Sequence, residues 1–473
     1  MQELILPPPL NKQSQRNILL GIGFGAIMTS FDSSAVGAVL PIIAHAFHRD
    51  ASSAQWLIVF YFLMICAFLL LAGRIGDLIG YTKVYLLGLK IFFVGALLSS
   101  IAPSLGTLIG FRIVEGGGAV LILANSAAIV TRFNAPNQRG RVLGLLSTMA
   151  YVGLTIGPVM AGWLTNVIGW RSIFIVTFIL AGLAHFIGSR VLPRDAPQNT
   201  IVRLDIPFTI LVAISLSFIV ISFNQGKTLK WHSFSSLCFA TSSVIITALI
   251  VRYGLKSDLK LLYNRMLTGA VVISILTYAA LTSVVFILPF YLLEVQRLSP
   301  LEAGLVLSVR PVLTAMLAPI SGVFSDKYRS YYISTLGLII LLAALISLTV
   351  LNNQSPTVDI ILSLAGIGAG MGIFIAPNHN IIMSASLISH KGIASAIIPL
   401  TRNLGMLFGA TLAGAIFSIK IDHLASAKDS LIFVTHTIFY FASFIGAITL
   451  LIMLVKSGSN FQNLWKKLKA FKG

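Results

Sequence analysis

Long, uninterrupted apolar stretches recur along this sequence, and they constrain its fold more than any other feature. A helix needs about 20 apolar residues to cross a bilayer, and in hydrocarbon only helices or closed barrels satisfy every backbone group. The sequence lacks the ten-residue alternation that is typical of barrel strands. It therefore predicts an all-α membrane protein with 14 transmembrane helices, near 17–43, 54–73, 83–102, 105–131, 139–165, 171–192, 204–223, 236–253, 267–293, 301–323, 331–351, 357–386, 392–419 and 431–456.

The positive charges are distributed unevenly between the predicted loops. The 473 residues carry a formal net charge of +19, which in a soluble protein would suggest nucleic-acid binding. If the N-terminus is inside, 22 of the 33 Lys and Arg residues fall on the inner face, seven on the outer face and four within spans. Cytoplasmic loops are the ones that accumulate Lys and Arg. We therefore expect both termini in the cytoplasm, a multi-pass protein in the lipid bilayer, and no nucleic-acid partner.

The rest of the composition argues against an enzyme or a metalloprotein. Cys66 and Cys238 both fall in apolar stretches, so we expect neither a disulfide framework nor a metal site, and we predict no cofactor. The sequence outside the spans has no nucleophile–base pair, phosphate loop or metal-ligand spacing. Residues 457–473 alternate aromatic and lysine side chains at helical spacing, which predicts a basic amphipathic tail on the inner leaflet, with a solvated tail as the alternative.

An internal repeat divides the chain into two similar halves. Matching pairs recur at offsets of 248 to 252 residues: Pro41 and Pro289, Gly73 and Gly322, Asp77 and Asp326, Gly118 and Gly370, Ala124 and Ala376, Gly140 and Gly392, Gly153 and Gly405, Gly157 and Gly409, and Gly162 and Gly414. Duplicated halves around a central pathway are typical of secondary transporters. We predict a six-helix bundle over 1–200, an inserted two-helix hairpin over 201–260, a second six-helix bundle over 261–456, and the tail over 457–473.

Five motifs, in order along the chain, resemble those of a known transporter family. They are D-S-S-A-V-G-A-V-L-P from Asp32, Q-W followed by Tyr61, G-R-I-G-D-L-I-G-Y-T-K from Gly73, R-I-V-E-G-G-G-A from Arg112 and G-L-T-I-G-P-V-M-A-G from Gly153. Together they resemble the major facilitator superfamily, and within it the fourteen-span drug–proton antiporter branch. The third motif departs from the family pattern at Leu78 and Tyr81, where Arg is usual, and the fourth has Glu115 in place of Gln. The resemblance implies multidrug efflux in exchange for protons, across the cytoplasmic (inner) membrane of a bacterium.

Three ionisable residues of the N-terminal half are candidates for proton coupling. Asp32 lies about midway along the first span, where a carboxylate tends to hold a proton when dry and to release it when water or a cation reaches it. Arg112 shares a helix face with Glu115 at i,i+3, and its partner is either Glu115 or Asp32. An arginine stays charged, so Arg112 tunes a carboxylate rather than carrying the proton. Which carboxylate carries the proton stays open, and a purely structural ion pair is the alternative.

Four polar residues of the C-terminal half are candidates for contacts with the cargo. Arg310 and Arg402 lie within spans, and their cost in hydrocarbon favours a position facing a cavity. Asn378 and His379 follow a proline in a glycine-rich span, and they either line the substrate site or satisfy a kink. Lys90, by contrast, is expected to snorkel back to the cytoplasmic face.

Two further motifs supply candidate moving parts. We assign the loop motif and its repeat counterpart to cytoplasmic loop gates that contain Gly73, Asp77 and Asp326. The motif in the fifth span is expected to form a flexing or closely packed helix that prevents leak, through Gly153, Gly157, Pro158 and Gly162.

These observations predict a proton-coupled antiporter that exports small amphipathic molecules by alternating access, driven by the proton motive force, and we expect a monomer. The predicted spans contain two acidic residues and three arginines, and this balance of charge favours a neutral or anionic cargo. The alternative is therefore an exporter or symporter of one neutral or anionic metabolite, such as a siderophore. A membrane scaffold or receptor that does not transport is the alternative from a different class, and it predicts that the charges within the spans are dispensable.

Overall fold

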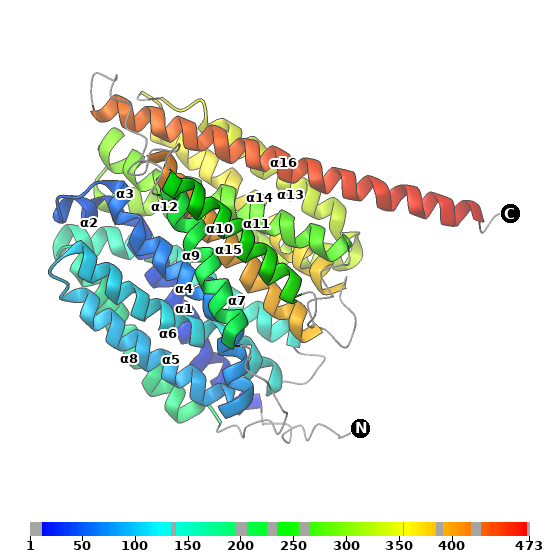
Figure 1. Ribbon diagram of the computed structural model, residues 1–473, viewed down its shortest axis with the longest axis horizontal. Helices are drawn as coiled ribbons and strands as arrows, with labels where there is room; N and C mark the ends of the chain where they lie inside the picture. The colour runs from blue at the N-terminus through cyan, green and yellow to red at the C-terminus, as the bar shows by residue number, and fades with distance from the viewer. Residues whose placement is uncertain are drawn as a thin grey trace. The chain divides into compact units, whose positions relative to one another are not determined.

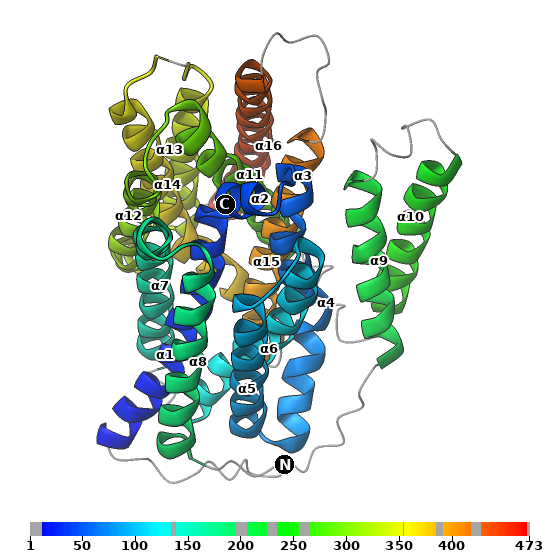
Figure 2. The ribbon, with the colours of Figure 1, turned by 90° about the vertical axis from the view of Figure 1, so that its left-hand side faces the viewer.

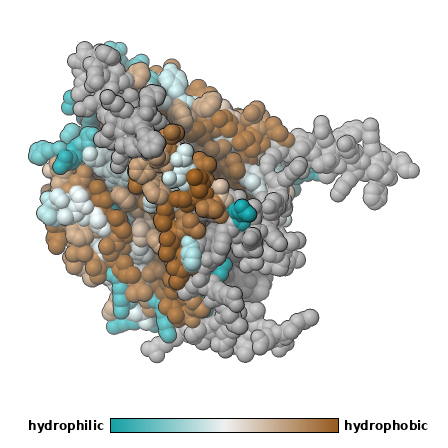
Figure 3. Space-filling view, viewed as in Figure 1, coloured by the Kyte–Doolittle hydropathy of each residue, from teal (hydrophilic) through white to brown (hydrophobic). Residues whose placement is uncertain are grey.

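The computed structural model is built from α-helices (Figure 1), and it describes residues 12–133, 139–193, 206–224, 234–254, 265–352, 354–384, 391–417 and 427–470. Within these ranges no residue lies in a β-strand. Apolar side chains cover most of the visible flank of the helices (Figure 3). The all-α class predicted from the apolar stretches is therefore confirmed for the described part of the chain.

Twelve stretches of described helix are long and apolar enough to cross a membrane, judged by length and composition. The short helix α3 (Ala51–Ala54) leads into one of them, and the π-helix η2 (Tyr291–Val295) continues another. The helices that contain these stretches are α1 (Lys12–Ala38), α4 (Trp56–Ile79), α5 (Tyr81–Ser100), α6 (Leu105–Arg132), α7 (Arg139–Val167), α8 (Arg171–Val191), α11 (Arg265–Phe290), α12 (Pro300–Lys327), α13 (Ser330–Leu348), α14 (Thr357–Ser384), α15 (Lys391–Phe417) and α16 (Ala427–Ala470).

Two more apolar helices form a pair in the region predicted as an inserted hairpin. Figure 2 shows α9 (Ile206–Asn224) and α10 (Phe234–Gly254) side by side. The hydroxyl oxygens of Ser215 and Thr247 lie 3.0 Å apart between them. Their described apolar cores, Thr209–Ser222 and Leu237–Leu249, are shorter than the other twelve spans. The described part of the chain thus has twelve candidate spans, and the prediction of 14 is not confirmed.

The first predicted span differs from the structure because the helix is interrupted. The prediction placed one helix over 17–43, but α1 ends at Ala38 and α2 (Leu40–Ala46) begins after Val39. Pro41 lies in the first turn of α2, where a residue without a backbone N–H starts a helix well and continues one poorly. Asp32 therefore lies in the C-terminal third of α1 rather than at its middle.

The motif predicted as a loop between the second and third spans is also helical. Gly73 and Asp77 both lie in the last turns of α4, and the only residue between α4 and α5 is Gly80. Gly80 has a φ of 101°, which glycine adopts far more readily than any other residue. The counterparts Gly322 and Asp326 lie in α12 in the same way. The turn needs only one residue, so the rest of the motif remains in the helix.

The helices form two compact units that share a pairing pattern. One unit comprises Met1–Ile250 with Arg297–Ser308, and the other comprises Val251–Gln296 with Val309–Gly473. In the first, α1 packs on α7 and α8, and α5 packs on α6 and α8. In the second, α11 packs on α15 and α16, and α13 packs on α14 and α16.

Glycines sit at the same helix crossings in both units. A Cβ atom on Gly118 would meet the backbone at Phe92 and Gly88, and one on Gly370 would meet Leu341 and Gly337. The α1–α7 crossing at Gly153 and Gly157 corresponds in the same way to the α11–α15 crossing at Gly405 and Gly409. Helices that approach this closely in a membrane use small residues at the contact. The repeat seen in the sequence is therefore a repeat of helix packing, although Gly140 and Gly392 have no described side-chain surroundings.

The last helix continues beyond its predicted span. The prediction ended the span near residue 456 and began a separate short helix at 457, but α16 runs without a break from Ala427 to Ala470. The side chains from residue 456 onward lie outside the described ones, so the amphipathic tail stays a prediction.

Candidate functional site

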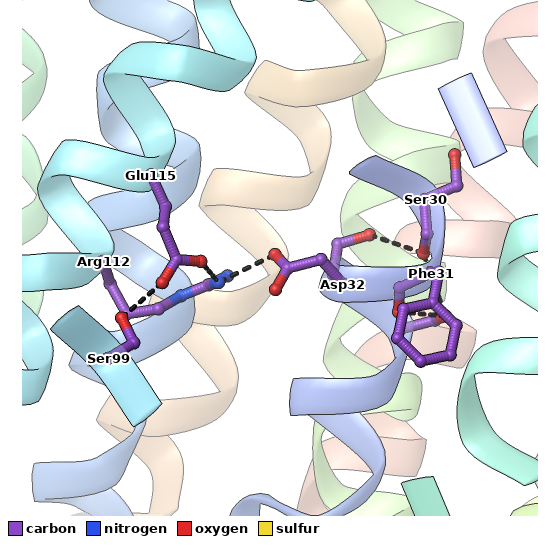
Figure 4. A network of polar contacts seen from close by, with 8 residues as sticks. Ser30, Phe31, Asp32, Ser99, Arg112 and Glu115 are labelled. Atoms are coloured by element: carbon purple, nitrogen blue, oxygen red, sulfur yellow. Dashed lines mark hydrogen bonds and ion pairs between the residues drawn. The ribbon is translucent and has the colours of Figure 1, made fainter. Parts of the chain in front are cut away.

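Three charged side chains are buried together in the first unit. Arg112 of α6 donates a hydrogen bond from Nη1 to Oδ2 of Asp32 on α1 at 2.7 Å. The same nitrogen donates to Oε2 of Glu115, one turn further along α6. Figure 4 shows the guanidinium between the two carboxylates. The side chains of Arg112, Asp32 and Glu115 are 1%, 0% and 0% exposed, so this ion pair network is shielded from both solvent and lipid.

Neighbouring helices complete the surroundings of this network. Ser99 of α5 donates its hydroxyl proton to Oε1 of Glu115. The guanidinium carbon of Arg112 lies 4.4 Å from the ring centre of Tyr61 on α4, within cation–π range. A Cβ atom on Gly95 would meet Glu115 at 2.7 Å, so the absence of a side chain there lets α5 approach α6. Four helices thus hold three charges in place.

Two polar atoms of the network have no hydrogen-bond partner among the described residues. Oδ1 of Asp32 and Nε of Arg112 are buried and make no hydrogen bond within the described part of the chain. Both oxygens of Glu115, by contrast, accept hydrogen bonds. With all three groups ionised the network carries one net negative charge in a low-dielectric site, and an added proton makes it neutral. Oδ1 of Asp32 is the one carboxylate oxygen of the network that accepts no hydrogen bond from the described residues.

The network resolves one question that the sequence left open. The sequence offered Glu115 or Asp32 as the partner of Arg112, and the structure shows that the guanidinium binds both. The i,i+3 spacing identified the contact with Glu115, but only packing brings α1 against α6. Ser99 was missed, since one serine in an apolar helix carries no signal of its own. Tyr61 was quoted only as part of a motif.

The residues assigned to loop gates are not part of the buried ion pair network. Asp77 accepts a hydrogen bond from the hydroxyl of Tyr81, and the guanidinium carbon of Arg132 lies 5.8 Å from the Tyr81 ring centre. Tyr81 stands where the resemblance expected an arginine, so an aromatic hydroxyl holds the carboxylate instead. Gly73 has no atom within 4 Å of its hypothetical Cβ. The side chain of Asp326 is outside the described ones.

The antiporter-motif helix, α7, packs closely through its glycines. Gly153 faces the carbonyl of Ile27, and Gly157 faces the hydroxyl of Ser34, both on α1. Gly162 faces the carbonyl of Pro300, and Pro158 presents its own carbonyl to Gly304, in the part of α12 that belongs to the first unit. This helix therefore packs closely at Gly153, Gly157 and Gly162, while flexing and the prevention of leak remain expectations.

The predicted cargo residues come together within the second unit. The Asn378 amide on α14 donates to the hydroxyl of Ser274 on α11 at 2.6 Å. The positive charge of Arg402 acts on both Tyr278 and His379, and that of Arg310 acts on Tyr278. Sequence reasoning missed Ser274 and Tyr278, because α11 has no charged residue beyond its first turn to draw attention to it.

The described residues contain no group of three or more His, Cys, Asp and Glu side chains placed to hold a metal ion. Lys90, which the sequence predicted to snorkel, is exposed on α5.

Comparisons with known proteins agree with the helical architecture. The sequence matches the family model described as Major Facilitator Superfamily over residues 22–410 and again over 270–467. It is 30% identical over 417 residues to the riboflavin transporter RibZ of Clostridioides difficile, covering 87% of this chain and 90% of that protein. It is 24% identical to the multidrug resistance protein Stp of Mycobacterium tuberculosis, covering 86% and 76% respectively. The crystal structure of the peptide transporter POT in complex with sulfate has the same fold, with a TM-score of 0.69 at 14% identity over 92% of this chain and 94% of that one.

Proposed function

Since the chain belongs to the Major Facilitator Superfamily, a family of transporters and not of enzymes, we propose that it is a proton-coupled antiporter. It exports small amphipathic molecules across the cytoplasmic membrane of a bacterium by alternating access, and it works as a monomer. The observation that carries this proposal is the buried network in which Arg112 bridges Asp32 and Glu115. Ionisable residues inside a membrane are costly and mark proton or substrate pathways.

The network gives a protonation step with a structural consequence. A proton on Asp32 removes the negative charge that ties α1 to Arg112. Glu115 lies on the same helix as Arg112 and keeps the guanidinium paired, so no unpaired cation is created. Protonation therefore loosens α1 from α6 while α6 stays intact. A change in helix contacts driven by one charge is the kind of two-state element on which alternating access depends.

The cargo is assigned to the second unit, through Arg310, Arg402, Asn378 and His379. The named relatives support small organic molecules as the class, since one is a riboflavin transporter and another is a multidrug resistance protein. A specific neutral or anionic metabolite, exported or taken up by symport, is the second candidate. It is favoured by the position of the acidic residues in the described part of this unit, which lie near helix ends: Glu294, Asp326, Asp359 and Asp429.

The topology is part of the same proposal. We place both termini in the cytoplasm and count α9 and α10 as two further spans, which gives 14. In this topology Asp77 lies at the cytoplasmic end of α4, beside Tyr81 of α5, and Asp326 lies at the cytoplasmic end of α12. We assign both carboxylates to gates.

The arrangement is tested with single cysteines in a variant with Cys66→Ala and Cys238→Ser. An impermeant maleimide added to whole cells should label Gly226→Cys and leave Ser257→Cys unlabelled. Labelling of both or of neither excludes a spanning hairpin in this orientation.

The function is tested in proteoliposomes that contain a pH-sensitive dye. A panel of cationic, neutral and anionic compounds is added to the native protein and to Asp32→Asn. We expect compounds of at least one charge class to drive proton movement in the native protein only. If Asp32→Asn responds like the native protein, Asp32 is not the proton carrier and Glu115→Gln is tested in its place. If the native protein moves no protons with any compound, proton-coupled antiport is wrong.

Asp50→Asn is the matched control for this experiment. Asp50 lies outside the spans and caps α3. Partial burial acts to raise the pKa of Asp50, but the hydrogen bonds from Ser53 and Ser52 outweigh it and leave the pKa below its usual value. Asp50 is therefore ionised throughout the range of about pH 6–8 and takes up no proton there. Its amide variant should transport like the native protein.

A further inference from the structure

A cluster of polar side chains from four helices lies inside the second unit. Tyr278 and Ser274 lie one turn apart on α11, and Ser274 is joined to Asn378 of α14 by the 2.6 Å hydrogen bond. Arg402 lies one turn before Gly405 on α15, and a Cβ atom on Gly405 would meet Tyr278. The close α11–α15 crossing therefore places Arg402 beside Tyr278.

A second arginine reaches the same place from α12. Arg310 lies where α12 crosses α14, because a Cβ atom on Gly368 would meet the backbone of Arg310. Thr314 fixes this crossing by donating a hydrogen bond to the carbonyl of Gly368 at 3.0 Å. Both arginines act electrostatically on the hydroxyl of Tyr278, and Arg402 also acts on His379. The cluster thus concentrates positive charge around one phenol group.

Among the described residues, Arg402 is not paired with a carboxylate as Arg112 is in the first unit. Arg112 has two carboxylates, whereas Arg402 makes no ion pair within the described part of the chain. Nε of Arg402 and Oδ1 of Asn378 are both buried without a hydrogen-bond partner there, and Asn378 is 1% exposed. Buried polar atoms in native proteins are almost always paired, so these two atoms are free to bond to a polar ligand.

We infer that this cluster binds the acidic group of the cargo, and that the cargo is an organic oxyanion such as a carboxylate. The guanidinium of Arg402 offers planar donors that match a carboxylate, and the hydroxyl of Tyr278 offers another donor beside it. The inference rests on the proposed transport function and narrows its substrate class. A purely structural role, in which the arginines only brace helices, predicts no preference between a charged cargo and its neutral analogue.

The test uses a pair of probes that differ only in the acidic group: an aromatic carboxylic acid and its primary amide. Their transport is followed in proteoliposomes, and their binding to purified protein is followed by the shift in thermal midpoint. We expect the native protein to bind the carboxylate at least about tenfold more tightly, since a hydrogen bond to a charged group is worth this much in affinity. Arg402→Gln should remove that preference by weakening carboxylate binding more than amide binding.

Two further variants keep the test decisive if Arg402→Gln folds poorly. Asn378→Asp adds a negative charge with almost no change of volume, and it should weaken carboxylate binding about tenfold or more without weakening amide binding. Lys90→Gln removes a positive charge from the exposed face of α5 in the first unit and should bind both probes as the native protein does.

The outcomes separate the two proposals. If the carboxylate binds with the expected preference but drives no proton movement, the oxyanion site stands and proton-coupled antiport falls. If carboxylate and amide bind equally in the native protein, or if Arg402→Gln weakens both equally, the oxyanion site is wrong whatever the protons do.

Discussion

At the scale of single residues, Arg112 determines whether the buried acids of the first unit are tolerated. Breaking a buried ion pair by removing one partner is far more costly than replacing the whole group by neutral residues, because the remaining charge is left without compensation. Arg112 is the ion-pair partner of both Asp32 and Glu115, which lie on different helices. Its loss therefore affects both the contact between α1 and α6 and the packing within α6.

We expect Arg112→Ala to destabilise the protein by about 3–5 kcal/mol. Adding Asp32→Asn and Glu115→Gln to this variant should restore most of the stability, because no buried charge then remains. Thermal unfolding in detergent measures both effects. A triple variant that is less stable than Arg112→Ala would contradict the argument, since packing rather than charge would then hold the site. Neither variant should transport protons.

A second residue-scale effect concerns the backbone. His48 and Arg297, which are 249 residues apart and thus related by the repeat, both have positive φ angles, of 50° and 58°. The left-handed conformation costs a residue with a Cβ atom roughly 1–2 kcal/mol of stability, and glycine avoids this cost. Glycine instead loses about 0.5–1 kcal/mol of stability, because its unfolded chain has more conformational freedom. Arg297→Gly should therefore match or raise the thermal midpoint, whereas Arg297→Val should lower it. Equal midpoints for the two variants would show that the turn is not held in this conformation.

At the scale of helices, glycine content matters only where helices cross. Gly153 and Gly144 lie on the same helix, α7, but a Cβ atom on Gly153 would meet the backbone of α1, whereas one on Gly144 would meet nothing within 4 Å. The same substitution therefore has opposite consequences at two positions of one helix. Glycine in a helix interior is intrinsically less stable than alanine, and only the close crossing reverses the balance.

We expect Gly153→Ala to separate α1 from α7, to cost about 1–3 kcal/mol through overpacking, and to impair transport. Gly144→Ala is the control on the same helix, and it should gain up to about 1 kcal/mol through helix propensity with transport unchanged. Thermal midpoints and transport rates of the two variants are compared directly. If both variants behave alike, the crossing at Gly153 is not as close as the structure shows.

This contrast also explains what the sequence could predict at this scale. The helices follow from apolar length, and the repeat follows from the spacing of glycines, since both are local properties of the chain. The break at Val39 and the helical position of Asp77 depend on how a single turn closes, and a hydropathy pattern does not contain that information. For the site, the sequence identified Asp32, Arg112 and Glu115 by their cost in hydrocarbon. It could not supply Ser99 or Tyr278, whose roles come from packing against other helices.

At the scale of the whole molecule, the two units have the same helix pairing but different charges: the ion pair network of the first is buried, and the two arginines of the second are half-buried. The interior of the first unit contains Asp32 and Glu115 against Arg112, and the polar cluster of the second contains Arg310 and Arg402. By the repeat, Arg310 corresponds to Tyr61, which is 249 residues earlier, so the halves diverged in charge while keeping their crossings. Under the proposed function, the proton belongs to the first unit and an anionic cargo to the second.

This division predicts how transport depends on the membrane potential. If one proton enters at Asp32 as one carboxylate cargo leaves, both movements carry positive charge inward, and two charges cross in each cycle. At 100 mV each charge contributes about 2.3 kcal/mol, so the driving force is about 4.6 kcal/mol for the carboxylate and about 2.3 kcal/mol for its neutral amide. The steady-state gradients in proteoliposomes with an imposed potassium diffusion potential should therefore differ, and the logarithm of the carboxylate gradient should rise twice as steeply with potential.

Equal slopes for the two probes would contradict this coupling, because the carboxylate would then cross without its charge or with a different number of protons. Asp32→Asn supplies the control. Without the proton step, the potential acts on the carboxylate alone and does not act on the amide. The amide gradient of this variant should therefore be independent of potential, while any remaining carboxylate gradient should follow the slope of a single charge. Comparing the slopes of the native protein and Asp32→Asn thus measures separately the charge moved with the proton and the charge moved with the cargo.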